Sequence, residues 1–153
     1  MRRSWILRSA VALMLMASLV LPTLALAKGA KGGTPADRAQ ATLTTLQARY
    51  DATTARVSAK LARLTAAADK LEAAGTDVST IRAAVVAVNA KLAIAASEKA
   101  KAVELLNAVA GSSDQKAALK TAKVQVASVH TALKATRAEL RIAAAAVRAA
   151  KGK

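Results

Sequence analysis

Residues 113–151 read SDQKAALKTAKVQVASVHTALKATRAELRIAAAAVRAAK, and this stretch decides the fold. Its apolar and small residues recur at alternating intervals of three and four. The positions are Leu119, Ala122, Val126, Val129, Leu133, Thr136, Leu140, Ala143, Val147 and Ala150. This spacing is the a/d pattern of a helix that packs lengthwise against other helices. We therefore predict one long amphipathic helix over 113–151.

Two further segments, 35–74 and 77–110, carry related patterns and are also predicted to be helices. In segment 35–74, one apolar position recurs every seven residues. A second apolar row begins at Leu46 and continues with irregular spacing to Leu61 and Ala68. The repeating position is Leu43, Tyr50, Val57, Leu64 and Leu71. The second segment has the row Ile81, Val85, Val88, Leu92, Ala95, Ala102, Leu106 and Val109, which Lys99 interrupts. Short connections favour antiparallel neighbours, so we predict an all-α fold, an up-down-up three-helix bundle over 35–151.

The predicted helix boundaries contain residues that are typical of helix ends. Thr34 followed by Pro35 indicates an N-cap and a first helical position. Gly75 is typical of a C-cap, and Asp77 is expected to cap the next helix. Gly111 is a second glycine at a predicted helix end. Residues 112–115, Ser-Ser-Asp-Gln, are expected to form a capping box at the start of the last helix.

The N-terminal segment, 1–27, has the organisation of a Sec-type signal peptide. Three arginines precede a 13-residue apolar run, Ser9–Leu21, and Ala25-Leu26-Ala27 supplies the small residues of a cleavage site. A run of this length is shorter than the roughly 20 residues of a spanning helix, although a retained membrane anchor is the alternative. We expect export to the periplasm, cell surface or medium. Residues 28–34 are expected to form a flexible, basic, glycine-rich tail.

The chain after residue 27 is strongly basic and has a sparse core. It contains 21 basic and nine acidic residues, a net charge of +12, and no cysteine. Tyr50 is its only aromatic residue. We expect little buried apolar area per residue, and therefore marginal stability or completion by oligomerisation. No later apolar run is expected to approach spanning length, which predicts a soluble protein.

Basic residues follow the predicted core positions in two rows. The row of the last helix contains Lys120, Lys123, His130, Lys134, Arg137, Arg141, Arg148 and Lys151. The row of the first helix contains Arg49, Arg56, Arg63 and Lys70, with Lys60 beside it. Neither row contains an acidic residue, so pairs within a row cannot neutralise it. Depending on the handedness of the bundle, the rows face each other or flank the middle helix.

These rows predict an anion-binding surface; the alternative is a solubility or adhesion surface without a specific ligand. The candidate partners are an anionic envelope polymer, a membrane surface or an acidic protein. Sequence-specific nucleic-acid binding is disfavoured because only one aromatic residue is present for stacking. The apolar residues lack Trp and Phe anchors, which indicates electrostatic docking to membranes rather than insertion.

No residue constellation predicts catalysis, a metal site or a cofactor. His130 is the only histidine, and without cysteine it cannot form a transition-metal site. The nine acids form no convincing general acid/base pair. We therefore predict a non-enzymatic binding protein without a cofactor. The alternatives are a structural coiled-coil protein that forms homo-oligomers and a chaperone-like holdase.

The segment LEAAGTDVS, residues 71–79, lies at the first predicted turn, after a signal peptide and an Ala/Lys-rich helix. In this respect the chain resembles uncharacterised exported bacterial helical-hairpin proteins. The resemblance covers the first two predicted helices. It implies a bacterial envelope or secreted setting and brings no known activity.

Overall fold

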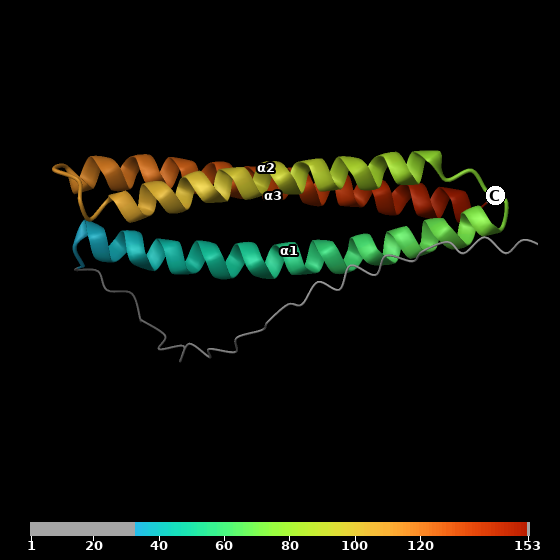
Figure 1. Cartoon of the computed structure of the whole chain (residues 1–153), viewed down its shortest axis with the longest axis horizontal. Coiled ribbons are helices and arrows are strands. Elements are labelled where there is room, and N and C mark those ends of the chain that lie inside the picture. Colours follow the sequence, from blue (N-terminus) through green and yellow to red (C-terminus); the bar gives the residue numbers. More distant parts are fainter. Residues whose placement is uncertain (1–32, 153) are drawn as a thin grey trace, which may run out of the picture. The chain divides into compact units, whose positions relative to one another are not determined.

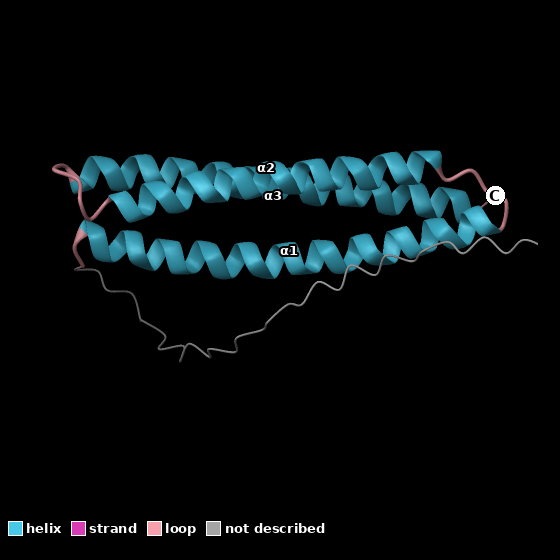
Figure 2. Ribbon diagram, viewed as in Figure 1, coloured by secondary structure: helices cyan, strands magenta, loops and turns pink. Residues whose placement is uncertain are grey.

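The computed structural model describes residues 33–152, which form three α-helices and no strand (Figure 1; Figure 2). The helices are α1 (Pro35–Ala73), α2 (Ser79–Ala108) and α3 (Gln115–Lys151). The predicted all-α class with three helices is confirmed, and each predicted boundary lies within two residues of the observed one. The predicted signal peptide, 1–27, and nearly all of the predicted tail, 28–34, lie outside the described residues.

Side chains satisfy the free backbone N–H groups at the start of α1 and α3. Thr34 and Asp37 form a capping box, in which Thr34 Oγ1 accepts from the Asp37 N–H at 3.2 Å and Asp37 Oδ2 accepts from the Thr34 N–H at 2.9 Å. The Thr34 hydroxyl also donates to Asp37 Oδ2 at 2.8 Å, and this bond, followed by the one from the Thr34 N–H, lowers the pKa of Asp37. At α3 the predicted Ser-Gln capping box is wrong. Asp114 is the N-cap and accepts from the Ala117 N–H at 3.0 Å, while the Gln115 side chain donates to the Ala110 carbonyl.

The loop between α1 and α2 contains the one positive φ angle among the described residues, +81° at Gly75. Thr76 N–H donates to the Leu71 carbonyl at 2.9 Å, and Gly75 N–H donates to the Glu72 carbonyl at 2.9 Å. This pair of bonds is the Schellman motif, which requires a left-handed residue and therefore favours glycine. Asp77 accepts from the Ser79 N–H at 2.9 Å, but the N-cap of α2 is Val78.

The predicted core rows are the buried faces of the helices. In α3, eight of the ten predicted positions are buried, and the other two, Val126 and Ala150, are half-buried. In α1, Leu43, Leu46, Val57, Leu61 and Ala68 are buried, together with Ala39 and Thr53. Thr53 occupies a core position that the apolar pattern did not identify because its side chain is polar.

α2 differs from the expectation that no apolar run after residue 27 approaches spanning length. By length and composition alone this helix could cross a membrane, because it has 30 residues and a window with a mean hydropathy of 1.4. Alanine and valine dominate it, and Arg82 and Lys91 are the only charged residues between Ser79 and Ser97. Core helices of soluble bundles share this composition, so the finding by itself does not place α2 in a membrane.

Side-chain contacts fix which parts of the helices are neighbours. Asp51 of α1 contacts Lys99 of α2, and Asp69 contacts Arg82. Gln125 of α3 donates to Glu98 of α2. Arg137 of α3 donates to Thr53 of α1, so the middle of α3 lies beside the middle of α1. α3 packs more extensively against α2 than against α1, and α1 and α2 have the least contact of the three pairs.

Candidate functional site: a basic groove between α1 and α3

Three hollows follow one another along the seam between α1 and α3, and we call them together the basic groove. Their volumes are about 290, 460 and 490 Å³. Arg49 and His130 line both of the first two hollows, and Arg137 lines both of the last two. Because neighbouring hollows share residues, they follow one another along the two helices, and Arg137 stands between the last two.

The basic groove gathers eight of the thirteen predicted anion-binding residues. They are Arg49, Arg56, Lys60 and Arg63 of α1 and His130, Arg137, Arg141 and Lys151 of α3. The two basic rows therefore face each other across the α1–α3 seam, which was one of the two arrangements that the sequence left open. Lys70, Lys134 and Arg148 are exposed and do not line the groove hollows.

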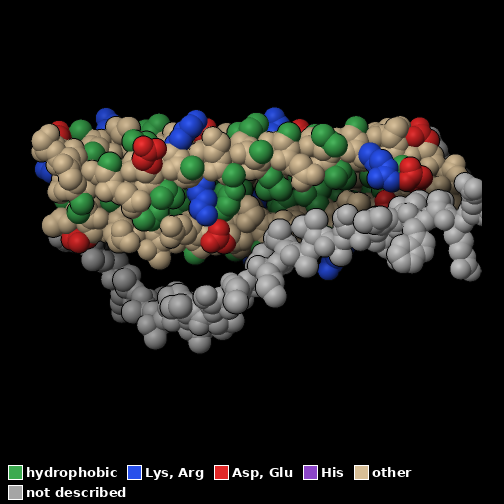
Figure 3. Space-filling model, viewed as in Figure 1, with side chains coloured by type: hydrophobic (Ala, Val, Ile, Leu, Met, Phe, Trp, Pro, Cys, Tyr) green, Lys and Arg blue, Asp and Glu red, His purple; other side chains and the backbone are tan. Residues whose placement is uncertain are grey.

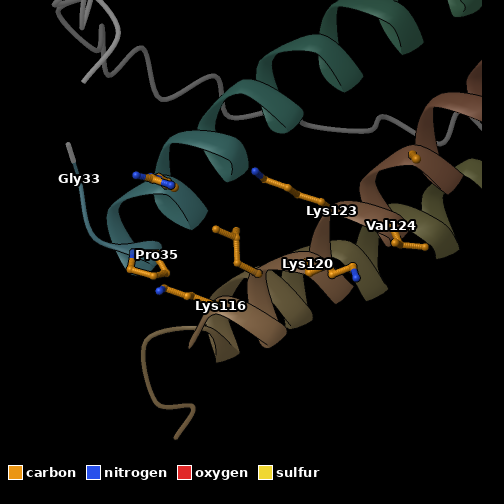
Figure 4. A pocket seen from close by; sticks show the side chains of 9 residues that line it. Gly33, Pro35, Lys116, Lys120, Lys123 and Val124 are labelled. Carbon is orange, nitrogen blue, oxygen red and sulfur yellow. The ribbon is translucent and has the colours of Figure 1, made fainter. Parts of the chain in front are cut away.

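The remaining two predicted residues, Lys120 and Lys123, line a fourth hollow of about 720 Å³ between the first turns of α1 and α3. We call it the end hollow (Figure 4). The side chains of Lys116 and Lys123 extend from α3 toward α1, whereas Lys120 points away from it. Arg38 completes the lining from α1.

Two basic residues of the end hollow, Arg38 and Lys116, were not predicted. Lys116 lies seven residues before Lys123 and continues the same row, so the heptad spacing could have identified it. Arg38 is outside the sevenfold row of α1, whose earlier members would be Thr42 and Pro35. Only the packing of α1 against α3 brings Arg38 to the hollow.

One groove cation is anchored by the opposite helix. Arg137 donates a hydrogen bond of 3.0 Å to Oγ1 of Thr53, whose side chain is buried with 8% exposure. A single acceptor leaves the other donors of the guanidinium group available, because arginine carries five. Thr53 therefore holds Arg137 at the groove without neutralising it.

Carboxylates are absent from the lining of the basic groove and of the end hollow, within the part of the chain that the structure describes. The ion pairs of residues 33–152 all involve cations of α2. Lys99 pairs with Asp51 at 3.2 Å, Lys101 pairs with Glu98 at 3.0 Å, and Arg82 pairs with Asp69 and Glu72. The hydrogen bonds that Lys101 and Gln125 donate lower the pKa of Glu98, and those that Arg82 donates to Glu72 and Asp69 raise the pKa of Arg82.

On the face in Figure 3, several basic side chains touch acidic ones beside a band of apolar side chains. The positive charge of the described residues is unevenly distributed. Three of the four cations of α2, all except Lys91, take part in ion pairs, whereas, within residues 33–152, the cations of the basic groove do not.

Tyr50 is covered by an intramolecular contact. The Lys99 ammonium nitrogen lies 4.3 Å from the centre of the Tyr50 ring, within the range of a cation–π interaction. The same nitrogen contacts Asp51, so Lys99 ties α2 to two neighbouring residues of α1. The only aromatic ring of the described residues is therefore occupied and does not line the groove.

The groove has the chemistry of a binding surface. Arginine and lysine supply only hydrogen-bond donors and positive charge at neutral pH. No group of three or more His, Cys, Asp or Glu side chains that could hold a metal ion occurs within residues 33–152. His130 is exposed and lines one hollow together with Arg49 and Arg137, without a carboxylate among the residues that line it.

No family model matches the chain, and no curated protein and no solved structure shows significant similarity to it.

Proposed function

We propose that this protein is an exported, non-enzymatic binding protein that attaches through the basic groove to an anionic component of the cell envelope. The observation that carries the proposal is the composition of the groove. Eight basic side chains from two helices line it, and no carboxylate does. A groove lined by one sign of charge attracts ligands of the other sign and concentrates them locally.

We infer that the helices run up-down-up. Two connections, of five residues (74–78) and six residues (109–114), support this arrangement because they favour antiparallel neighbours. Contact pairs agree with it. Residue numbers rise along α1 from Asp51 to Asp69 while they fall along α2 from Lys99 to Arg82.

The envelope setting follows from residues 1–27, which have the composition of a signal peptide. A basic protein outside the cytoplasm meets anionic wall polymers, lipopolysaccharide and lipid headgroups. The absence of cysteine is compatible with that compartment when helix packing alone supplies the stability.

Binding to an isolated anionic envelope fraction, followed as a function of salt, tests the proposal. We expect binding at low salt that weakens steeply as the salt concentration rises. The double charge reversal Arg137→Glu and Arg141→Glu should abolish most of the binding while circular dichroism stays helical. If the unmodified protein shows no affinity for envelope fractions at low salt, the proposal is wrong.

A structural role through homo-oligomerisation is a second candidate, because four large aliphatic side chains are exposed. They are Val86, Ile94, Val124 and Ile142, with 49–67% exposure. Light scattering across a range of protein concentrations tests this role. A monomer at every concentration, with an unchanged melting temperature, would exclude it.

A further inference from the structure

We infer that the basic groove holds a single extended polyanion, a linear polymer that carries an anionic group on each repeat unit. This inference rests on the proposed function and names the partner that the groove fits. A membrane surface is the competing partner, and the test below separates the two.

The cations form a series along the groove. The hydrogen bond from Arg137 to Thr53 shows that the middle of α3 lies beside the middle of α1. α1 contributes Arg49, Arg56, Lys60 and Arg63, and α3 contributes Arg137, Arg141 and Lys151.

Along α1, successive groove cations are three to seven residues apart, which is about 5–10 Å along a helix at 1.5 Å per residue. Both helices contribute cations, so cations approach the groove from two sides. This series is complementary to a ligand whose charges also repeat along a line. A small isolated anion would contact only one or two of these cations.

The floor of the groove is formed by small and aliphatic residues. Ala52, Ala67 and Ala144 lie between the cations and leave space close to the helix backbones. A narrow, unbranched polymer backbone can enter this space while its anions reach the cations on either side. The groove offers no aromatic ring, and Tyr50 is covered by Lys99, so bases would have nothing to stack on.

The position of the exposed aliphatic residues argues against a membrane as the partner. Proteins that dock on lipid place apolar anchors among their cations, so that both reach the interface together. Val86, Ile94 and Ile142 do not line the basic groove, and Val124 lines the end hollow instead. The groove cations face one another across a depression, where a flat bilayer could contact only the outermost of them.

The decisive experiment compares three probes with the purified protein. They are inorganic polyphosphate long enough to span the groove, tripolyphosphate, and vesicles of phosphatidylglycerol and phosphatidylcholine. The groove from Ala41 to Ala67 covers 27 residues, about 39 Å. We expect the long polymer to bind at least 100-fold more tightly than tripolyphosphate. With about six contacts, the logarithm of its binding constant should fall with the logarithm of salt concentration with a slope of roughly −4.

Two double variants of α3 remove the same charge from different places. Arg137→Gln with Arg141→Gln removes two groove cations, and Lys134→Gln with Arg148→Gln removes two exposed cations outside the groove hollows. Loss of two contacts should weaken polyphosphate binding by about 25-fold at 0.1 M salt. The second pair should change it by less than about threefold. Circular dichroism confirms that both variants remain helical.

Equal losses in the two variants would overturn the inference, because binding would then depend on total charge and not on the groove. Tighter binding to the vesicles than to polyphosphate would also overturn it, while the proposed attachment to an anionic envelope component would stand. If none of the three probes binds at low salt, the inference and the proposed function fail together.

Discussion

α1 meets α2 on one side and α3 on the other, and its charged residues differ between the two sides. Toward α2 it presents Asp51, Asp69 and Glu72, each paired with a cation of α2. Toward α3 it presents Arg49, Arg56, Lys60 and Arg63, which meet further cations of α3. The first side joins helices through compensated charge. The second side retains a positive surface whose electrostatic cost an anionic ligand would relieve.

This comparison shows why net charge alone says little about a binding surface. The same helix carries both compensated and uncompensated positions. Exposed ion pairs contribute little to stability, so the pairs along α2 are best understood as removing charge from that side. Stability must come from the apolar seams, which both sides share. The first two predictions below test the α3 side, and the last two test the sides that involve α2.

The largest expected effect is on stability, from Leu140→Ala. Leu140 is 7% exposed, packs with Val57, Leu61 and Val88, and lies in the floor of the groove. Its truncation should lower the free energy of unfolding by about 2–5 kcal/mol, because a buried leucine leaves a cavity. Chemical denaturation measures this loss. Ile142→Ala, at a position with 57% exposure, is the control and should be nearly neutral.

The next effect is on affinity, from Thr53→Val. This change keeps the shape of the side chain and removes the acceptor that holds Arg137. We expect polyphosphate binding to weaken by about threefold, because the freed arginine must be ordered again on binding. Thr136→Val is the matched control, since buried Thr136 bonds only to the Ala132 carbonyl of its own helix. An equal loss of affinity in both variants would contradict a positioning role for Thr53.

A smaller effect is expected on the α2 side, from Arg82→Gln. This variant breaks the exposed pairs with Asp69 and Glu72. The melting temperature should fall by no more than about 3 °C, because exposed pairs contribute little. Polyphosphate binding should be unchanged or only slightly weaker, because the lost charge lies outside the groove. A drop in affinity as large as that of a groove variant would show that the two sides are not distinct.

The smallest expected effect is on how stability changes at acid pH. It concerns Glu98 of α2, which accepts a hydrogen bond from Gln125 of α3. The folded-state pKa of Glu98 lies below its ordinary value of 4.5, because Lys101 and Gln125 bind the carboxylate. Glu98 therefore stabilises the fold above that pH, and this contribution is lost as the pH falls through the folded-state pKa. Melting temperatures at pH 7 and pH 3 should differ less in Glu98→Gln than in the unmodified protein. Glu104→Gln, at a residue outside these ion pairs, should keep the full difference.

The helices were predictable because their signals are local. The heptad row of α3 and the start at Thr34-Pro35 each depend on residues within one or two turns of each other. The predicted capping box of α3 was wrong for an equally local reason. Asp114 accepts the Ala117 N–H as the N-cap, one residue before Gln115. Thr53 escaped prediction because it is polar and the second apolar row of α1 is irregular, whereas the unbroken row of α3 identified the polar residue Thr136.

The apolar rows and the basic rows were also predictable, since each row belongs to one helix. Local spacing along the chain is enough to predict three long helices, their apolar seams and the acid-free rows of cations, because it sets which residues share a face of a helix. Which rows face each other depends on how the helices pack. This packing brought Arg38 to the end hollow, anchored Arg137 on Thr53 and directed Asp51, Asp69 and Glu72 toward α2. The rotation and register of each packed helix depend on contacts between residues far apart in the chain, and no local pattern encodes them.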